Sequence, residues 1–145
     1  MTVYLDSSVL AGVYLSDEAG HGQAVSLLED PELGLITGTT GVEVSGALVR
    51  AARSGGGDEK GLLALLDADL GVDGPVTVIA APQEDVEIQA LKLVRMHAIG
   101  AMDAWHLATA RIVLPSLAES GDDVGFATRD QAQSDVARML GFRSL

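Results

Sequence analysis

Four acidic residues lie at positions where their carboxylates could act together. Asp6 directly follows the first expected strand, and Asp130 is separated from the last clear strand by two residues. Glu43 and Asp103 each lie in the first turn of an expected helix. In a parallel sheet flanked by helices, strand ends and helix starts share one edge, where such folds bind their ligands. We therefore expect the four carboxylates to converge at that edge.

Convergence of carboxylates has an electrostatic consequence. Two like charges about 4 Å apart repel by about 4 kcal/mol at an effective dielectric constant of about 20, so a cluster needs a cation or must take up protons. The sequence has no cysteine and 3 histidines without a cluster, and oxygen ligands favour Mg²⁺ or Mn²⁺ over Zn²⁺. Such ions activate water and neutralise phosphate charge. The pattern therefore predicts metal-assisted phosphodiester cleavage.

Each acid also has a purely structural interpretation. Asp6 and Asp130 suit the N-cap of a helix, and Asp103 complements a helix dipole. The segment from Thr40 to Glu43 matches a capping box, in which Glu43 would bind only backbone N–H groups of its own helix. Capping does not explain why all four acids would share one edge, so both interpretations stay open at this point.

Short apolar strands that alternate with helices must position these acids. This alternation predicts an α/β fold, with a parallel sheet covered by helices. The apolar residues at 75–80 have the composition of a buried strand. We expect strands at residues 2–5, 33–37, 75–80 and 124–127, and helices at residues 7–15, 20–29, 39–53, 58–70, 82–97, 102–114 and 131–140.

The overall composition is that of an ordinary globular chain. Its 145 residues are 48% hydrophobic and 21% charged, which predicts one domain, residues 1–145, with a well-formed core. We find no signal-peptide pattern and no run of the ~20 apolar residues of a membrane helix, so we expect a cytoplasmic protein. The net charge of −12 argues against a broad basic face for nucleic acid, and the 3% aromatic content argues against a base-stacking platform.

The segments that carry the acids resemble a known family. In chain order they are Val-Tyr-Leu-Asp-Ser-Ser-Val-Leu (3–10), Val-Glu-Val (42–44), Ala-Met-Asp-Ala-Trp-His-Leu-Ala-Thr-Ala (101–110) and Phe-Ala-Thr-Arg-Asp (126–130). Together they are similar to PIN-domain ribonucleases, and most of all to the VapC toxins of bacterial toxin–antitoxin pairs. The resemblance extends over essentially the whole chain.

The resemblance implies a three-layer α/β/α sandwich with a central, mostly parallel sheet. It also implies endoribonuclease activity that depends on Mg²⁺, with Mn²⁺ as an alternative ion. Ser8 matches a small polar residue of the family and Thr128 a hydroxyl residue, and both would support the site through hydrogen bonds. The positions that match the family's catalytic and metal-binding acids are Asp6, Glu43, Asp103 and Asp130.

Asp122 and Asp123 are an alternative source of the fourth acid. They precede the last clear strand, so in a parallel sheet we expect them at the opposite edge. We therefore prefer Asp130.

Other charged side chains have weaker functional interpretations. Arg129, Arg50 and Arg53 are candidates for contacts with RNA phosphates, although solvated or dipole-paired arginines would look the same. His106 is one helical turn after Asp103 and could face the same cleft as a general base, a role that metal-bound water makes less necessary.

Two rival functions remain open from the sequence. A phosphoacceptor receiver-like signalling domain also gathers acids at strand ends, but Asp6 is not part of an acidic pair. The lysine that a receiver needs after a late strand is also missing, since Lys60 and Lys92 both fall in expected helices. The second rival is a catalytically inert PIN binding module, against which the intact set of acids argues.

The resemblance also implies partners besides the RNA substrate. It implies a cognate VapB-type antitoxin, through which any DNA contact would be made, and it makes a homodimer plausible; no membrane partner is expected. The acidic chain favours a basic partner. We expect an apolar helix of the antitoxin to lie near Val25, Leu28 and Val49, with a basic side chain that reaches Asp6 or Asp103. The alternative is that the three apolar residues are simply core.

Overall fold

Strands and helices alternate along the chain in the computed structural model, which describes residues 1–145. Each expected element is present, with ends shifted by a few residues. The strands are β1 (Thr2–Leu5), β2 (Gly34–Thr37), β3 (Val76–Val78), β4 (Val124–Ala127) and β5 (Arg143–Ser144). The helices are α1 (Ser7–Tyr14), α2 (His21–Glu29), α3 (Gly41–Gly55), α4 (Glu59–Asp69), α5 (Gln83–His97), α6 (Ala101–Leu117) and α7 (Gln131–Met139).

The strands form one sheet in the order β3-β2-β1-β4-β5, and every neighbouring pair is parallel. The central strand is β1, in which Tyr4 is aligned with Ile36 of β2 and Phe126 of β4. Because all strands run the same way, their carboxyl ends lie at one edge of the sheet. Asp6 follows β1 at this edge, as the sequence predicts.

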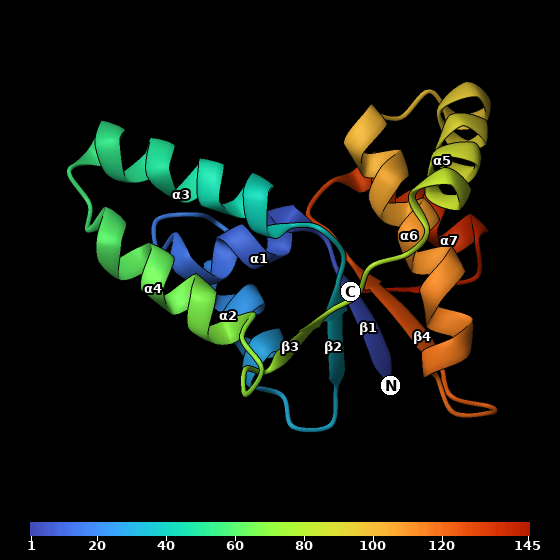
Figure 1. Ribbon diagram of the computed structural model, residues 1–145, viewed down its shortest axis with the longest axis horizontal. Coiled ribbons are helices and arrows are strands. Elements are labelled where there is room, and N and C mark those ends of the chain that lie inside the picture. The colour runs from blue at the N-terminus through green and yellow to red at the C-terminus, as the bar shows by residue number, and fades with distance from the viewer.

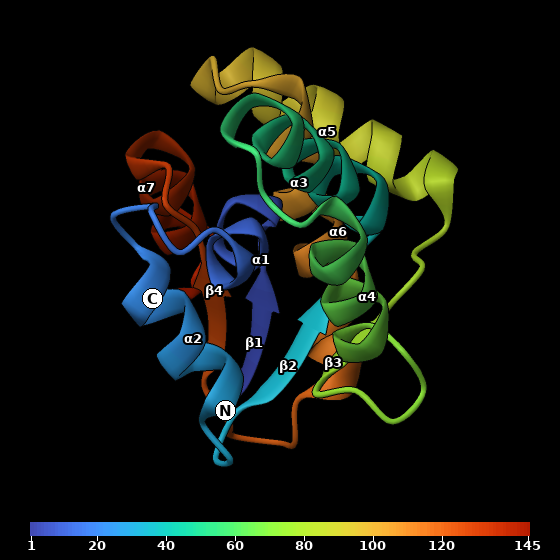
Figure 2. The same ribbon diagram turned by 90° about the vertical axis from the view of Figure 1, so that its left-hand side faces the viewer.

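Helices cover both faces of the sheet, which confirms the three-layer α/β/α sandwich (Figure 1). Successive side chains of a strand point to opposite faces. Val3 and Leu5 therefore pack with residues of α1 to α4, whereas Tyr4 packs with residues of α5 to α7. Figure 2 views the molecule from the side of α1 to α4.

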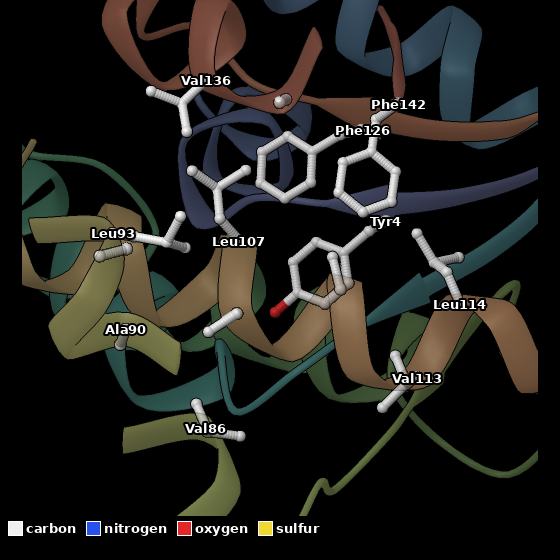
Figure 3. Close-up of a cluster of buried hydrophobic side chains, with 14 of the residues drawn as sticks. Tyr4, Val86, Ala90, Leu93, Leu107, Val113, Leu114, Phe126, Val136 and Phe142 are labelled. Atoms are coloured by element: carbon white, nitrogen blue, oxygen red, sulfur yellow. The ribbon is translucent and has the colours of Figure 1, made fainter. Parts of the chain in front are cut away.

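The core on the side of α5 to α7 is built around aromatic rings. Tyr4 and Phe126 are stacked, with ring centroids 5.4 Å apart and an interplanar angle of 4°, and Phe142 packs against Phe126 at 6.1 Å. Leu107 and Leu114 of α6 complete this region (Figure 3). The packing fixes Tyr4 rigidly at the centre of the sheet.

Two features of the sheet differ from the expectation. The strand β3 is only partly buried, because Val76 is 1% exposed but Val78 is 47% exposed. Its place at the end of the sheet leaves it a neighbouring strand on one side only. The strand β5 was not expected, because its two residues, Arg143 and Ser144, show no apolar alternation. They follow Gly141, whose φ of 92° lets the chain turn beside β4.

The helix ends are largely those that the sequence predicts. The helix α3 ends at Gly55 and is followed by Gly56 in the left-handed conformation, with φ of 70°. The helix α6 continues past the expected end to Leu117, although Pro115 in its last turn has no N–H group to donate to the preceding turn. None of the helices has the length and apolar character needed to cross a membrane.

Candidate active site

Asp6 is buried at the carboxyl edge of the sheet and is held by three donors. One carboxylate oxygen, Oδ2, accepts hydrogen bonds from the backbone N–H of Ser8 at 3.0 Å and from the Ser8 hydroxyl at 2.6 Å. The other, Oδ1, accepts from Nε2 of Gln133 at 3.2 Å. Asp6 is also the N-cap of α1. The cap fixes the direction of the carboxylate, so the structural and functional interpretations of Asp6 are compatible.

Gln133 of α7 has no exposed surface, and its side chain connects this helix to three other segments of the site. Its Nε2 donates to the carboxylate of Asp6 and, at 3.2 Å, to the backbone carbonyl of Asp103 at the start of α6. Its Oε1 accepts from the hydroxyl of Thr128 at 2.5 Å. The sequence alone does not single out Gln133, because glutamine on a helix is ordinarily a surface residue. Its only sequence signal is its position three residues after the N-cap Asp130.

Asp130 caps α7 at the same edge. Its Oδ1 accepts from the backbone N–H of Gln133 at 2.8 Å, and its own N–H donates to the hydroxyl of Thr128 at 3.1 Å. Thr128 thus supports the site through hydrogen bonds. Asp122 and Asp123 precede β4 and therefore lie at the opposite edge of the parallel sheet.

Glu43 turns toward the interior of the site and forms no capping box. Its Oε1 lies 2.7 Å from Nε2 of His106, and its Oε2 accepts from the hydroxyl of Ser7 at 3.2 Å. Thr40 makes no capping bond with its side chain, because its hydroxyl pairs with that of Thr37 at 3.0 Å. The capping-box interpretation of Glu43 is therefore wrong.

His106 is buried beneath the acids rather than facing an open cleft. It is 1% exposed, and its Nε2 lies 4.0 Å from Oδ1 of Asp6. Burial lowers the pKa of this imidazole. The hydrogen bond to Glu43 and the nearby negative charges outweigh that effect, so the pKa of His106 is raised above its ordinary value. The same hydrogen bond lowers the pKa of Glu43 against the opposing effect of burial.

The carboxylate of Asp103 is in a negative environment. Its pKa is raised first by partial burial and then by the charges of Asp6, Asp130 and Glu43, against which His106 acts in the opposite direction. Asp103 is therefore within electrostatic reach of the other three predicted acids. Asp103 is the one that accepts no hydrogen bond on its carboxylate.

The donor set fits a hard cation, although its side chains are not arranged as a complete metal site. No group of three or more histidine, aspartate or glutamate side chains is positioned to hold a metal ion. Asp6, Glu43 and Asp130 are instead held by protein donors. A partly buried carboxylate without a donor, such as that of Asp103, favours a nearby cation when other carboxylates surround it. Their oxygens are the ligands that Mg²⁺ and Mn²⁺ prefer.

The three candidate arginines lie in different surroundings. Arg53 pairs with Glu59 at 2.7 Å. The guanidinium of Arg129 pairs with Glu18 at 3.3 Å and packs against Gly20, where an added Cβ would lie 2.6 Å from the guanidinium carbon. Arg50 makes no ion pair.

A groove with a volume of about 390 Å³ adjoins the acids. Arg50 lines this groove together with Ser7, Ser8 and Glu43. Of the three arginines, Arg50 is therefore the one that shares a groove with one of the four acids, Glu43. Arg129 lines a different groove, together with Thr128.

Comparisons with known proteins agree with this fold. The family model described as PIN domain matches residues 3–139. The crystal structure of VapC20 from Mycobacterium tuberculosis, a sarcin-ricin loop cleaving toxin, has 22% sequence identity and a TM-score of 0.54, with 76% of this chain and 82% of that chain covered. VapBC-1 from nontypeable Haemophilus influenzae has 16% identity and a TM-score of 0.56, with 100% of this chain and 97% of that chain covered. These two likenesses concern the fold alone. No curated protein matches the chain in sequence.

Proposed function

The chain belongs to the PIN-domain family, and on this premise we propose that it is a metal-dependent endoribonuclease that acts as the toxin of a toxin–antitoxin pair. The observation that carries the proposal is the hydrogen-bonded network that links the acids. Gln133 bonds to the carboxylates of Asp6 and Asp130 and to the backbone of Asp103. Nε2 of His106 lies within 4.0 Å of carboxylate oxygens of both Asp6 and Glu43. A bound Mg²⁺ or Mn²⁺ would supply a Lewis acid and an activated water for hydrolysis of an RNA phosphodiester bond.

The residues of the chain divide into those that hold the metal and those that orient them. Ser8 and Gln133 fix the carboxylate of Asp6, and Thr128 fixes Gln133. Such supporting hydrogen bonds set the orientation and basicity of metal ligands. The four acids that would hold the metal are Asp6, Glu43, Asp103 and Asp130.

We further propose that Arg50 contacts a phosphate of the RNA. It lines the groove beside Glu43 and has no acidic partner, whereas Arg53 and Arg129 are engaged by Glu59 and Glu18. With a net charge of −12, the chain offers little other positive surface to an RNA strand. We also propose that the protein is cytoplasmic, where a cellular RNA substrate would be found.

The toxin assignment is supported by the fold shared with VapC20 and VapBC-1. We propose a basic, VapB-type antitoxin as the partner, with a homodimer as a further possibility for the toxin itself. The predicted contact residues Val25 and Val49 are half-buried, and Leu28 packs against the core. All three side chains are only partly buried, so an antitoxin helix at this place could contact each of them.

The nuclease proposal is tested by a metal titration followed by RNA cleavage. The purified chain is incubated with total cellular RNA, first with a chelator and then with increasing Mn²⁺ or Mg²⁺. We expect internal cleavage only with the metal. Binding of RNA without cleavage at any metal concentration would favour the inert PIN module. The family match leaves no support for the receiver-like alternative.

The toxin proposal needs a separate experiment. The chain is expressed alone and together with the neighbouring open reading frame, and growth and co-purification are measured. We expect growth arrest by the chain alone and relief by a neighbour that co-purifies with it. Normal growth without a partner would remove the toxin assignment and leave the nuclease assignment to its own test.

A further inference from the structure

Both ring nitrogens of His106 are engaged inside the protein. Nε2 lies 2.7 Å from Oε1 of Glu43, and Nδ1 lies 2.9 Å from the hydroxyl of Tyr4. The side chain is 1% exposed. Neither nitrogen is therefore directed at a substrate or a solvent molecule, and His106 can influence chemistry only through the residues that it touches.

The hydrogen-bond partners fix the direction in which His106 donates. Ionised Glu43 can only accept, so the hydrogen of its bond with His106 is on Nε2. Nδ1 of the neutral ring then accepts from the Tyr4 hydroxyl, whose oxygen in turn accepts from the backbone N–H of Gly38 at 3.0 Å. The one hydrogen of the neutral ring is therefore donated to Glu43. A doubly protonated ring also carries a hydrogen on Nε2. His106 thus donates to Glu43 in both protonation states.

This chain of hydrogen bonds is anchored in the buried aromatic core. Tyr4 has no exposed surface, stacks on Phe126, and has its hydroxyl on the side of α6 (Figure 3). A Cβ on Gly38 would lie 2.5 Å from the Tyr4 hydroxyl oxygen, so the close approach of this backbone requires glycine. Burial also raises the pKa of Tyr4, which keeps the hydroxyl protonated.

The Glu43 side chain has an alternative orientation, and the hydrogen bond with His106 must be more favourable than that alternative. Thr40 and Glu43 have the spacing of a capping box, in which the Glu43 carboxylate would turn back to the N-terminus of its own helix. In the structure the carboxylate instead points to His106 and Ser7. A half-exposed glutamate has several rotamers of similar energy, so a fixed donor decides among them.

We propose that His106 is a positioning residue that keeps the Glu43 carboxylate directed into the site, where it is available to a metal, rather than back to the N-terminus of its own helix. Tyr4 and Gly38 fix the histidine ring for this purpose. This inference rests on the proposed metal-dependent function. Residues that orient a metal ligand typically contribute about 10–100-fold to metal affinity or activity.

The test is the affinity of the full chain for Mn²⁺, measured by isothermal titration calorimetry. We expect His106→Leu to weaken Mn²⁺ binding by about 10-fold or more. His106→Gln should restore most of the affinity, because its amide nitrogen lies near the place of Nε2 and can donate to Glu43. Tyr4→Phe should weaken binding less than His106→Leu, because Glu43 keeps its donor but the ring loses its anchor.

His21→Leu is the matched control. His21 also makes a hydrogen bond with Nδ1, 2.9 Å from the carbonyl oxygen of Gly12, so its loss reproduces the removal of a bonded histidine outside the site. We expect the Mn²⁺ affinity of this variant to equal that of the wild type.

The outcomes separate the two claims. Wild-type affinity in folded His106→Leu overturns the positioning role, as does equal weakening by Leu and Gln at this position. Should His106→Leu not fold, Tyr4→Phe and His106→Gln decide: wild-type affinity in Tyr4→Phe, or a 10-fold loss in His106→Gln, contradicts the role. Absence of Mn²⁺ binding by the wild type overturns the proposed function itself, and the positioning role with it.

Discussion

Gln133 and Asp6 are 127 residues apart in sequence, and the amide of one donates a 3.2 Å hydrogen bond to the buried carboxylate of the other. The same amide group reaches the carbonyl of Asp103 and the hydroxyl of Thr128. The orientation of Asp6 therefore depends on how α7 packs against the sheet, and not only on the turn that follows β1.

Replacement of Gln133 by leucine should destabilise the fold. The substitution leaves Oδ1 of Asp6 without its donor and the hydroxyl of Thr128 without its acceptor, which costs about 1–3 kcal/mol of unfolding free energy. Urea unfolding monitored by circular dichroism measures this cost. Gln131→Leu, on the exposed side of the same helix, should change the stability by no more than about 0.5 kcal/mol. Equal effects of the two substitutions would show that the Gln133 bonds carry no special weight.

Asp103→Asn should leave the metal-free protein at least as stable as the wild type at neutral pH. The pKa of Asp103 is raised in the folded state, so its ionised form is disfavoured there and the amide removes this cost. The gain should be below about 1 kcal/mol, because the carboxylate is partly exposed. The gain should shrink as the pH falls through the raised pKa of Asp103, and it should be gone below the ordinary aspartate pKa of about 4, where the carboxyl is protonated in both the folded and the unfolded chain. Chemical unfolding at neutral pH and at a pH below about 4 tests this prediction. Asp122→Asn is the control, and it should leave the free energy of unfolding unchanged at both pH values.

The two tyrosines predict a loss of stability at alkaline pH. Burial raises the pKa of Tyr4, and burial together with the hydrogen bond from Tyr14 to Asp69 raises the pKa of Tyr14. Above pH of about 10 the unfolded chain releases these protons and the folded chain does not, so stability falls with rising pH. The slope is about 1.4 kcal/mol per pH unit for each tyrosine.

Near-ultraviolet absorbance of tyrosinate in an alkaline titration checks this prediction. It should appear only as the wild type unfolds, and Tyr14→Phe should halve the tyrosine contribution to the slope. Ionisation of both tyrosines in the folded protein near their ordinary pKa would contradict the burial argument.

Arg50→Ala should reduce the salt dependence of RNA binding. Each phosphate contact that is lost lowers the slope of log K against log salt by about 0.7 for a single strand. Arg53→Ala is the matched control, because Arg53 is paired with Glu59 and lies one turn away on the same helix. Fluorescence anisotropy with a labelled, cleavage-resistant RNA analogue gives both slopes. An unchanged slope in Arg50→Ala would remove this residue from the RNA contact.

The elements of the fold could be predicted because local signals agree with tertiary structure. The strand before Asp6 could be predicted because its apolar residues must be buried. The end of α3 could be predicted because its glycine run allows a left-handed backbone, which Gly56 adopts. The short strand β5 carries none, because its two residues pair with β4 through backbone groups that any sequence supplies.

The site could be predicted only as far as charge and position allow. The edge of a parallel sheet follows from topology, so Asp6 and Asp130 could be placed there from their positions after strands. The partner of Glu43 could not be predicted from the sequence. The spacing of Thr40 and Glu43 fits a local capping box as well as it fits a Glu43 side chain that points into the site. Which of these two orientations Glu43 adopts depends on α6, because this helix brings His106 to α3 across 63 residues of sequence.

The most direct test of the central claim compares RNA cleavage by Asp103→Asn and Asp122→Asn at increasing Mn²⁺. Asp103 lies among the acids that we expect to hold the metal, whereas Asp122 precedes β4 at the opposite edge of the sheet. Both changes remove one negative charge from an aspartate. We predict that Asp122→Asn cleaves RNA at the wild-type rate and that Asp103→Asn has no measurable metal-dependent cleavage. Full cleavage by Asp103→Asn would show that the acids at this edge are not the catalytic site.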